Sequence, residues 1–412
     1  MNTIPPFDAQ RLRADFPLLR MRVDGNPLIY VDNAATTQKP QAVINAVQDF
    51  YTHHNAPIGR GLYPLAEQAT ALYEKARATV ANFLGARDAS EIVFTHGATE
   101  SINMVAGAWA RTHVGIGDRI VVSALEHHSN VLVWQRFAAS RGAEFVIIPL
   151  RRDGRLAMDQ AASLINATTK LVAVCHVSNA LGTRVDVKHL ADMAHMVGAR
   201  ILVDGAQSVP HGGVDVQQLG CDMLAFSGHK IMGPTGIGVL YVRRELHDQF
   251  LPYHVGGGMV YEADYETATW RDMPYRLEAG SPPAEQAIGL AAALDYFTNN
   301  IDPQRLQEHE AALCAQFIDG IATLPGIRIL GPVGQLRVAG HLVSFVVDGV
   351  HAHDVAAYMG TYGICVRAGH HCAQPLAKQM EITASVRVSF YAYNTREDVE
   401  RCIDVIRQML TV

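Results

Sequence analysis

Seven short apolar runs alternate with amphipathic helical patterns between about residue 40 and residue 250, and this alternation limits the possible folds most. Such nearly continuous apolar runs are typical of strands that are covered on both faces. The runs are EIVFTHG, DRIVVSA, EFVIIPL, KLVAVCHVSN, RILVDGAQ, DMLAFSGHK and GVLYV, and residues 40–54 and 68–85 have helical patterns. The alternation predicts an α/β fold with a mostly parallel, seven-stranded sheet between helices.

The pattern changes near residue 295, where a long helix is predicted from DPQRLQEHEAALCAQFIDGIATLPG. After it, strands are predicted at HLVSFVVDG, GICVRAG and SVRVSFY, and the last helix at TREDVERCIDVIRQML. We therefore expect a large domain at residues 21–294. Residues 295–412 are expected to form a smaller α/β domain, against which residues 1–20 pack.

Composition and charge restrict the possible partners. The chain is 49% hydrophobic and 18% charged with a net charge of −6, which excludes a broad basic surface for nucleic acid or membrane. No apolar run approaches the length of a bilayer-spanning helix, and the first residues lack the apolar core of a signal peptide, so a cytoplasmic protein is expected. The six cysteines lack CxxC spacing, and neither disulfides nor a metal site is predicted.

Polar residues follow several predicted strands at their carboxyl ends, where open α/β sheets bind ligands. Ala98 and Thr99 precede a helix expected to begin near Glu100, so the free N–H groups there predict an anion site. The other polar residues at strand ends are Glu126, His127, His128, Ser178, Asn179, Asp204, Gln207, Ser227, His229 and Lys230. Singly, each is more often a helix cap, a turn residue or a surface residue, and only the joint arrangement predicts a site.

One cofactor, pyridoxal phosphate, needs this whole set of groups. Its phosphate suits a helix N-terminus, its pyridine nitrogen needs a carboxylate to stay protonated, and its aldehyde needs a lysine for a Schiff base. Desolvation of Lys230 beside His229 is expected to lower the lysine pKa, which favours the neutral amine that imine chemistry requires.

The motifs DGAQ, FSGHK and GPTGIGVLY resemble the class V aminotransferase family of pyridoxal-phosphate-dependent enzymes, which have the transferase fold of type I. EHHSNVLVW, LEAGSP and RAGHHCAQP make the chain similar to the cysteine desulfurases of the SufS/CsdA-like group, which also act as selenocysteine lyases. The resemblance runs from YVDNAATTQKP to SFYAYNTREDV.

The resemblance implies roles around the cofactor. Lys230 forms the Schiff base and acts as a base, Asp204 pairs with the ring nitrogen, and Gln207 bonds the ring hydroxyl. His127 stacks on the ring and assists proton transfer. The remaining cofactor contacts are implied for Ala98, Thr99, Asn179, Ser227, His229 and, from a second subunit, Ser281.

The resemblance also implies the substrate side of the site, with L-cysteine as substrate and L-selenocysteine following the same path. Arg387 and Asn179 are similar in position to the family's carboxylate binders. The other residues expected near the substrate are Asn33, Ala35, Arg367 and His370.

Cys372 is the implied sulfur acceptor, whose thiolate attacks the substrate sulfur and becomes a persulfide while alanine leaves. Arg367, His370 and His371 precede it within five residues, and cationic neighbours favour a thiolate. From the residues alone, a buried structural thiol is the alternative. The other five cysteines lie in apolar patterns and are interpreted as packing residues.

The chain departs from the family pattern at three places. The turn Gly97-Ala98-Thr99 stands where the family usually has a second threonine. Gly59-Arg60-Gly61-Leu62-Tyr63 stands where the family often has His-Arg-Gly-x-His, and Pro283 stands where asparagine is common. These changes affect the expected substrate entrance and subunit contact.

The resemblance further implies a homodimer, in which Ser281 and Arg60 complete the neighbouring site. It also implies a sulfur-acceptor protein of the SufE/CsdE or SufU kind and a role in iron–sulfur cluster assembly. Two alternatives remain open. The chain is either another class V enzyme that does not use Cys372, such as an aminotransferase, a kynureninase-like lyase or an epimerase, or it is a non-catalytic scaffold.

Overall fold

The computed structural model describes residues 7–411 and places all seven predicted strands in one sheet. Strand β10 is antiparallel to β4 and β9, whereas the remaining pairs are parallel. In sheet order the strands are β4 (Ile92–Thr95), β10 (Gly238–Val242), β9 (Met223–Ser227), β8 (Arg200–Asp204), β7 (Thr169–Cys175), β5 (Arg119–Ser123) and β6 (Glu144–Ile148). The predicted α/β class and mostly parallel sheet are confirmed.

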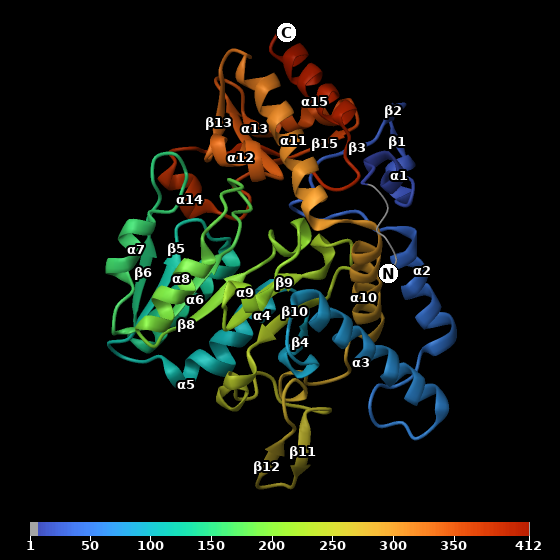
Figure 1. Ribbon diagram of the computed structural model, residues 1–412, viewed down its shortest axis with the longest axis vertical. Helices are drawn as coiled ribbons and strands as arrows, with labels where there is room; N and C mark the ends of the chain where they lie inside the picture. Colours follow the sequence, from blue (N-terminus) through green and yellow to red (C-terminus); the bar gives the residue numbers. More distant parts are fainter. Residues whose placement is uncertain (1–6, 412) are drawn as a thin grey trace.

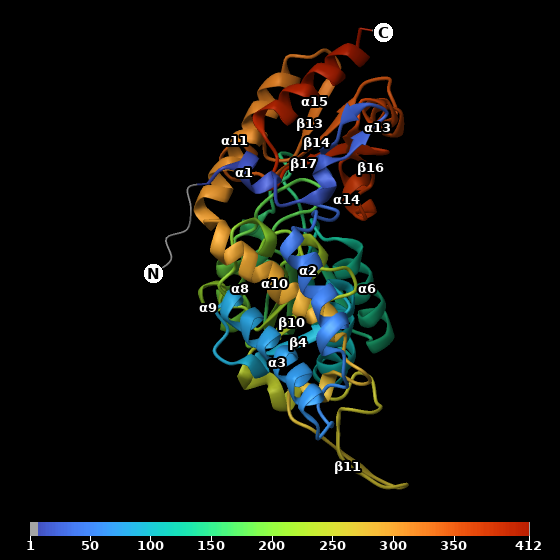
Figure 2. The same cartoon turned by 90° about the vertical axis from the view of Figure 1, so that its right-hand side faces the viewer.

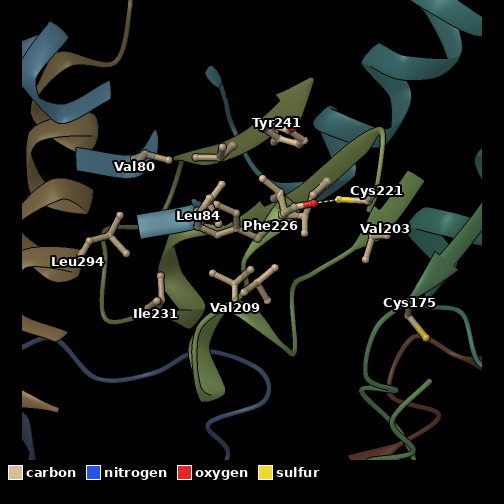
Figure 3. Close-up of a cluster of buried hydrophobic side chains, with 14 of the residues drawn as sticks. Val80, Leu84, Cys175, Val203, Val209, Cys221, Phe226, Ile231, Tyr241 and Leu294 are labelled. Carbon is tan, nitrogen blue, oxygen red and sulfur yellow. Dashed lines mark hydrogen bonds between the residues drawn. The ribbon is translucent and has the colours of Figure 1, made fainter. Parts of the chain in front are cut away.

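Alternate residues of each strand enter separate cores on the two faces of this sheet. In β9, Leu224 and Phe226 enter one core, while Met223 and Ala225 enter the other, as the two-residue period of a strand requires. Figure 3 shows Phe226 beside Leu84 in the first of these cores. The prediction that both faces of each strand are covered is wrong for β6, because Ile147 of this edge strand is 38% exposed.

Helices form a layer on each side of the sheet (Figures 1 and 2). The first core contains side chains of α2 (Gln41–Asp49), α3 (Pro64–Leu84), α7 (Met158–Leu164), α8 (Val187–Met196), α9 (Val216–Leu219) and α10 (Ala284–Asn300). The second core contains side chains of α4 (Ala98–Met104) and α6 (His128–Arg141), with α5 (Arg111–His113) nearby. Helix α3 begins four residues before the predicted start, because Pro64 is favourable in a first turn.

A second, antiparallel sheet lies above the first in Figure 1. Its order is β13 (Ile327–Leu330), β14 (Leu342–Val347), β17 (Ser385–Ser389) and β16 (Arg367–Gly369). Its core is shared with α11 (Pro303–Ala322), α13 (Ala352–Thr361) and α15 (Arg396–Met409). Two further helices, α12 (Val333–Ala339) and α14 (Gln374–Gln379), lie in its connections.

The N-terminal segment packs against this second part of the chain. In α1 (Ala9–Arg13), Arg13 donates to the Tyr393 carbonyl and to Asp398. Strand β3 (Ile29–Tyr30) pairs in parallel with β15 (Ile364–Cys365). Residues 1–6 of the predicted N-terminal segment lie outside the described residues. Because α10 continues unbroken to Asn300, the predicted boundary at 294/295 falls within a helix.

Two short strand pairs were not predicted. They are β1 (Arg22–Val23) with β2 (Asn26–Pro27), and β11 (Val260–Ala263) with β12 (Ala268–Trp270), which projects from the body in Figure 1. Among the described residues, no helix is both long and apolar enough to cross a membrane.

A buried ion pair joins α3 to the turn before α10. Arg77 donates to both carboxylate oxygens of Glu278 at 2.6 and 2.9 Å, and to the Ile92 carbonyl at 2.9 Å. Glu278 also accepts the backbone N–H of Phe94 at 2.7 Å. Exposed fractions of 1% for Arg77 and 9% for Glu278 remove both charges from water, so each charge depends on the other.

We expect Arg77→Met to lower the free energy of unfolding by about 3–5 kcal/mol, because Glu278 then stays buried without its partner. Urea unfolding followed by circular dichroism measures this change. The matched control is Arg87→Met, which removes an exposed pair with Glu245 and should cost less than about 1 kcal/mol. Equal effects of the two variants would contradict the analysis.

Candidate active site

The carboxyl ends of the parallel strands open onto a cavity of about 200 Å³. Residues of β16 and β17 in the second sheet also line it. The lining consists of Ala34, Ala35, Ala98, Thr99, His127, Ser129, Cys175, Val177, Asn179, Asp204, Ala206, Gln207, Ser227, His229, Lys230, Arg367, His371, Cys372 and Arg387. The predicted strand-end residues are thus largely brought together in one place.

The start of α4 forms one end of the cavity. Gly97, at φ +154, turns the chain from β4 into the helix, and a Cβ on the neighbouring Gly238 would lie 2.3 Å from its Cα. The N–H of Ala98 donates to the Ser227 hydroxyl at 2.9 Å, and the Thr99 hydroxyl lies 2.6 Å from that of Ser129. Backbone N–H groups and hydroxyls at a helix start form a site suited to an anion.

Asp204 ends β8 and is buried, accepting the N–H of Ala206 at 3.0 Å. Burial raises the pKa of this carboxyl group, and the positive charge of Lys230 counteracts the rise. Three residues further on, the Gln207 side chain donates to the carbonyl of Ala34 at 2.7 Å. A carboxylate and a fixed carboxamide therefore line the same wall.

Lys230 follows β9 in a single helical turn and remains partly accessible from the cavity. Burial lowers the pKa of its amine to about 8, while Asp204 and Cys372 counteract this effect. The turn is held by the carbonyl of His229, which accepts hydrogen bonds from Thr36, Thr37 and Lys39. A fraction of the Lys230 amine on the order of a tenth is consequently neutral at pH 7, far more than for an ordinary lysine.

His127 is the N-cap residue of α6, and its Nδ1 accepts the N–H of Ser129 at 3.1 Å. Burial, followed by the charge of Lys230, lowers its pKa to about 4, so the imidazole is neutral. The preceding Glu126 is fully buried and accepts from Asn130 and from the N–H of Cys175, each at 2.7 Å. Glu126 thereby links the ends of β5 and β7 next to the His127 backbone.

Arg387 enters the cavity from β17 in the second sheet. It donates to the Asn179 carbonyl at 2.7 Å and to Asp32 at 3.2 Å, and within the described residues its buried Nε has no partner. The side chain of Asn179 donates in turn to the His371 carbonyl at 2.6 Å. Arg367 lines the cavity as well, and it is the register partner of Arg387 in the neighbouring strand.

Cys372 lies on the loop before α14, and it is the exposed member of the six cysteines. Cys365 is half-buried and the other four are buried. The Cys372 carbonyl accepts the N–H of His128 at 2.7 Å. In both ribbon views α14 lies between the second sheet and α6, at the junction of the two parts of the chain (Figures 1 and 2).

Three predicted residues lie elsewhere in the described structure. Asn33 is buried and bonded to the Ser389 carbonyl and to Asn394, so its amide does not line the cavity. His370 is exposed, and its neighbour His371 lines the cavity instead. Ser281 lines a different cleft together with Arg60.

Sequence reasoning missed several lining residues, and those with an imidazole or a hydroxyl group are His371 and Ser129. His371 was named only as a neighbour of Cys372, and its φ of +53° turns its ring inward to Ser385, with an Nε2–Oγ distance of 3.0 Å. Ser129 was passed over although it lies two residues after His127, where a first-turn hydroxyl can reach the α4 start. The spacing to His127 was the available signal for Ser129, whereas no sequence signal marks the turn at His371.

The sheet order and a ligand cavity at its carboxyl edge define the α/β transferase fold of type I. The aminotransferase class V family matches residues 29–402, and the chain belongs to this family. The chain is 45% identical to the cysteine desulfurase of Haloferax volcanii, over 97% of this chain and 96% of that protein. It is 44% identical to the cysteine desulfurase of Klebsiella pneumoniae strain 342, over 96% and 97%.

Solved structures agree with these sequence relatives. The cysteine desulfurase of Thermococcus onnurineus NA1 superimposes with a TM-score of 0.93 at 40% identity and covers 100% of both chains. The cysteine desulfurase CsdA of Escherichia coli gives a TM-score of 0.90 at 38% identity over 99% of both chains. The predicted resemblance and the predicted fold type are confirmed.

We expect the Lys230 amine of the cofactor-free protein to titrate near pH 8, rather than near the ordinary 10.5, because burial disfavours its charged form. Acetic anhydride labelling at a series of pH values, read by peptide mass spectrometry, gives the midpoint. Asp204→Asn should lower the midpoint further, since the carboxylate stabilises the ammonium form.

Exposed Lys188 serves as the control in the same samples, and its labelling should not change with Asp204→Asn. A Lys230 midpoint at or above pH 10, or a midpoint that rises in Asp204→Asn, would refute this electrostatic description.

Proposed function

We propose that the protein is a pyridoxal-phosphate-dependent cysteine desulfurase that converts L-cysteine to L-alanine and carries the sulfur as a persulfide on Cys372. The main support is that an amine with a lowered pKa and an exposed cysteine thiol, Lys230 and Cys372, line the same cavity. The whole family requires the lysine amine. The cysteine thiol distinguishes a desulfurase from the other class V enzymes considered above.

The donor and acceptor groups of the cavity fit this cofactor. The α4 start with Thr99 and Ser227 offers N–H and hydroxyl groups to a phosphate. The buried carboxylate of Asp204 suits a protonated ring nitrogen. The positive charge of that nitrogen would offset the free-energy cost of burying the carboxylate charge. Lys230 and Gln207 line the same cavity as these groups.

When bound, pyridoxal phosphate supplies an electron sink that makes the substrate Cβ–Sγ bond labile. Lys230 then removes the proton from the substrate Cα, a role for which a pKa near the working pH is favourable. His127 faces the same space as a neutral imidazole, so it can accept a proton without first losing one.

Arg387 is proposed to bind the substrate carboxylate. Asp32 and the Asn179 carbonyl hold two guanidinium nitrogens, which fixes the plane of the group and leaves its Nε available. Arg367 adds a second positive charge on the same side of the cavity. Arginine pairs well with carboxylates, because its planar fork matches two oxygens.

Cys372 performs the sulfur transfer in this proposal. Its thiolate attacks the Sγ of the substrate, and an S–S bond forms as the Cβ–Sγ bond breaks. The electron pair of the broken bond stays on Cβ, where a proton completes alanine. Arg367 and Arg387 line the same cavity as Cys372 and add positive charge to the space in which this step takes place.

The wider role follows from the family resemblance. We propose a homodimer, since Ser281 and Arg60 lie together in a cleft away from the cavity of their own chain. We further propose that the persulfide passes to a SufE/CsdE- or SufU-like acceptor for iron–sulfur assembly, that L-selenocysteine is also a substrate, and that the protein works in the cytoplasm.

We expect Cys372→Ala to reduce alanine formation from L-cysteine at least about a hundredfold, because the nucleophile is lost. The visible spectrum of bound cofactor should stay unchanged, since Lys230 and Asp204 remain. Mass analysis of the wild-type peptide containing Cys372, after incubation with L-cysteine, should show one added sulfur atom.

Cys365→Ala is the matched control, and it should keep full turnover because this half-buried thiol does not line the cavity. Undiminished alanine formation by Cys372→Ala would remove this thiol from the reaction, and a cofactor-bound wild-type protein that forms no alanine from L-cysteine would favour another class V reaction. A wild-type protein that binds no cofactor would favour the scaffold alternative.

We expect Arg387→Lys to raise KM for L-cysteine about tenfold or more, because a lysine offers a point charge in place of the fork. Steady-state kinetics of alanine formation measure this effect. Arg328→Lys, on the exposed surface of β13, is the control in the same sheet. An unchanged KM in Arg387→Lys would remove this residue from the substrate site.

A further inference from the structure

A buried cluster of three side chains lies behind Gln207 and is not used by the proposed reaction. His341 precedes β14, and its Nε2 lies 3.2 Å from the Gln207 Oε1. The His341 ring stacks on that of His211, with centroids 3.7 Å apart and planes at 18°. His211 Nδ1 lies 2.8 Å from a carboxylate oxygen of Glu310 in α11.

The hydrogen bond from Gln207 to Ala34 determines how the Gln207 carboxamide is oriented and which nitrogen of His341 carries the proton. Because the Gln207 Nε2 donates to the Ala34 carbonyl at 2.7 Å, its Oε1 must face His341. A carboxamide oxygen only accepts, so the His341 Nε2 must carry the hydrogen. One Nε2–H of Gln207 is used by Ala34, and the other remains for a ligand in the cavity that Gln207 lines.

We infer that His341 is a positioning residue of the cofactor ring site, which holds and polarises the Gln207 carboxamide by donating to its oxygen. The inference rests on the proposed function, in which the free Gln207 N–H binds the ring hydroxyl of pyridoxal phosphate. Donation to the amide oxygen strengthens the amide as a donor, since hydrogen bonds in a chain polarise one another.

The surroundings keep His341 in one place and in one charge state. It is 2% exposed, and its carbonyl accepts the N–H of Phe390 at 2.7 Å, which continues the β14–β17 pairing. Burial, followed by the charge of His211, lowers the pKa of His341 well below its ordinary value, so the ring carries a single proton. The His211–Glu310 pair fixes the plane against which this ring stacks.

The test compares variants that keep or remove the donor at residue 341. His341→Phe keeps a flat ring but has no donor, and His341→Gln keeps an N–H near the position of Nε2. In the holoenzyme, we expect His341→Phe to bind pyridoxal phosphate about three- to tenfold more weakly, as for one lost hydrogen bond. The pH midpoint of the visible cofactor band should move upward, because the ring oxygen loses part of its donor. His341→Gln should restore both values.

A double-mutant cycle separates positioning from general stability. In a Gln207→Leu background, His341→Phe should change neither value further, because its effect acts through Gln207. His195→Phe is the control for loss of an imidazole that bonds a buried carboxylate, Asp222, away from the cavity. It should lower the melting temperature without moving the cofactor band. If His341→Phe does not fold, His341→Asn, whose N–H is too short to reach Gln207, replaces it.

Wild-type values in folded His341→Phe, or equal losses in both backgrounds of the cycle, would overturn the inference. Its failure is distinguishable from failure of the proposed function by nitrogen-15 NMR of the cofactor-free protein. The His341 signal should be that of the Nε2–H tautomer and should shift in Gln207→Leu. A protein that shows this coupling but binds no pyridoxal phosphate would refute the proposed function alone.

Discussion

The burial of Asp204 and Lys230 at one edge of a parallel sheet is the constraint on which the rest of the structure depends. Each group is unfavourable in the protein interior when it is charged, and each counteracts the pKa shift of the other. Strands β8 and β9 pair in parallel, with Asp204 opposite Ala225, and the carboxyl ends of both strands therefore lie at this edge. A ligand that has a cationic ring nitrogen and an aldehyde would satisfy both groups at once.

The cavity exists because segments that are distant in the sequence close over this edge. Ser344 of β14 donates to the Ala180 carbonyl at 2.6 Å, and Arg387 of β17 donates to the Asn179 carbonyl beside it. From the N-terminal part, Thr37 accepts the N–H of Met232 at 2.7 Å. The second sheet therefore does more than cover the first, because it contributes the two arginines and the cysteine loop to the same site.

The sequence was sufficient to predict the elements that depend on local interactions. All seven strands of the first sheet were predicted, because a strand covered on both faces needs an apolar run, and the polar residues that end these runs formed most of the site. Residues whose placement depends on tertiary contacts were not predictable in this way. Asn33 belongs to a buried network with Asn394, and His341 reaches Gln207 only because the start of β14 lies beside the turn after β8. No periodicity in the sequence encodes either contact.

The loop that carries Cys372 shows how the fold positions a reactive group without enclosing it. His371 and Cys372 both have positive φ values, +53° and +55°, a conformation that is unfavourable for residues with a Cβ. Hydrogen bonds from the segments that follow β7 and β5 hold this conformation, since Asn179 donates to the His371 carbonyl and the N–H of His128 donates to the Cys372 carbonyl. This backbone conformation turns the His371 side chain inward. The Cys372 thiol then lines the cavity and is also exposed to solvent. The proposed sulfur transfer requires this combination, because one sulfur atom must meet the substrate and then an acceptor.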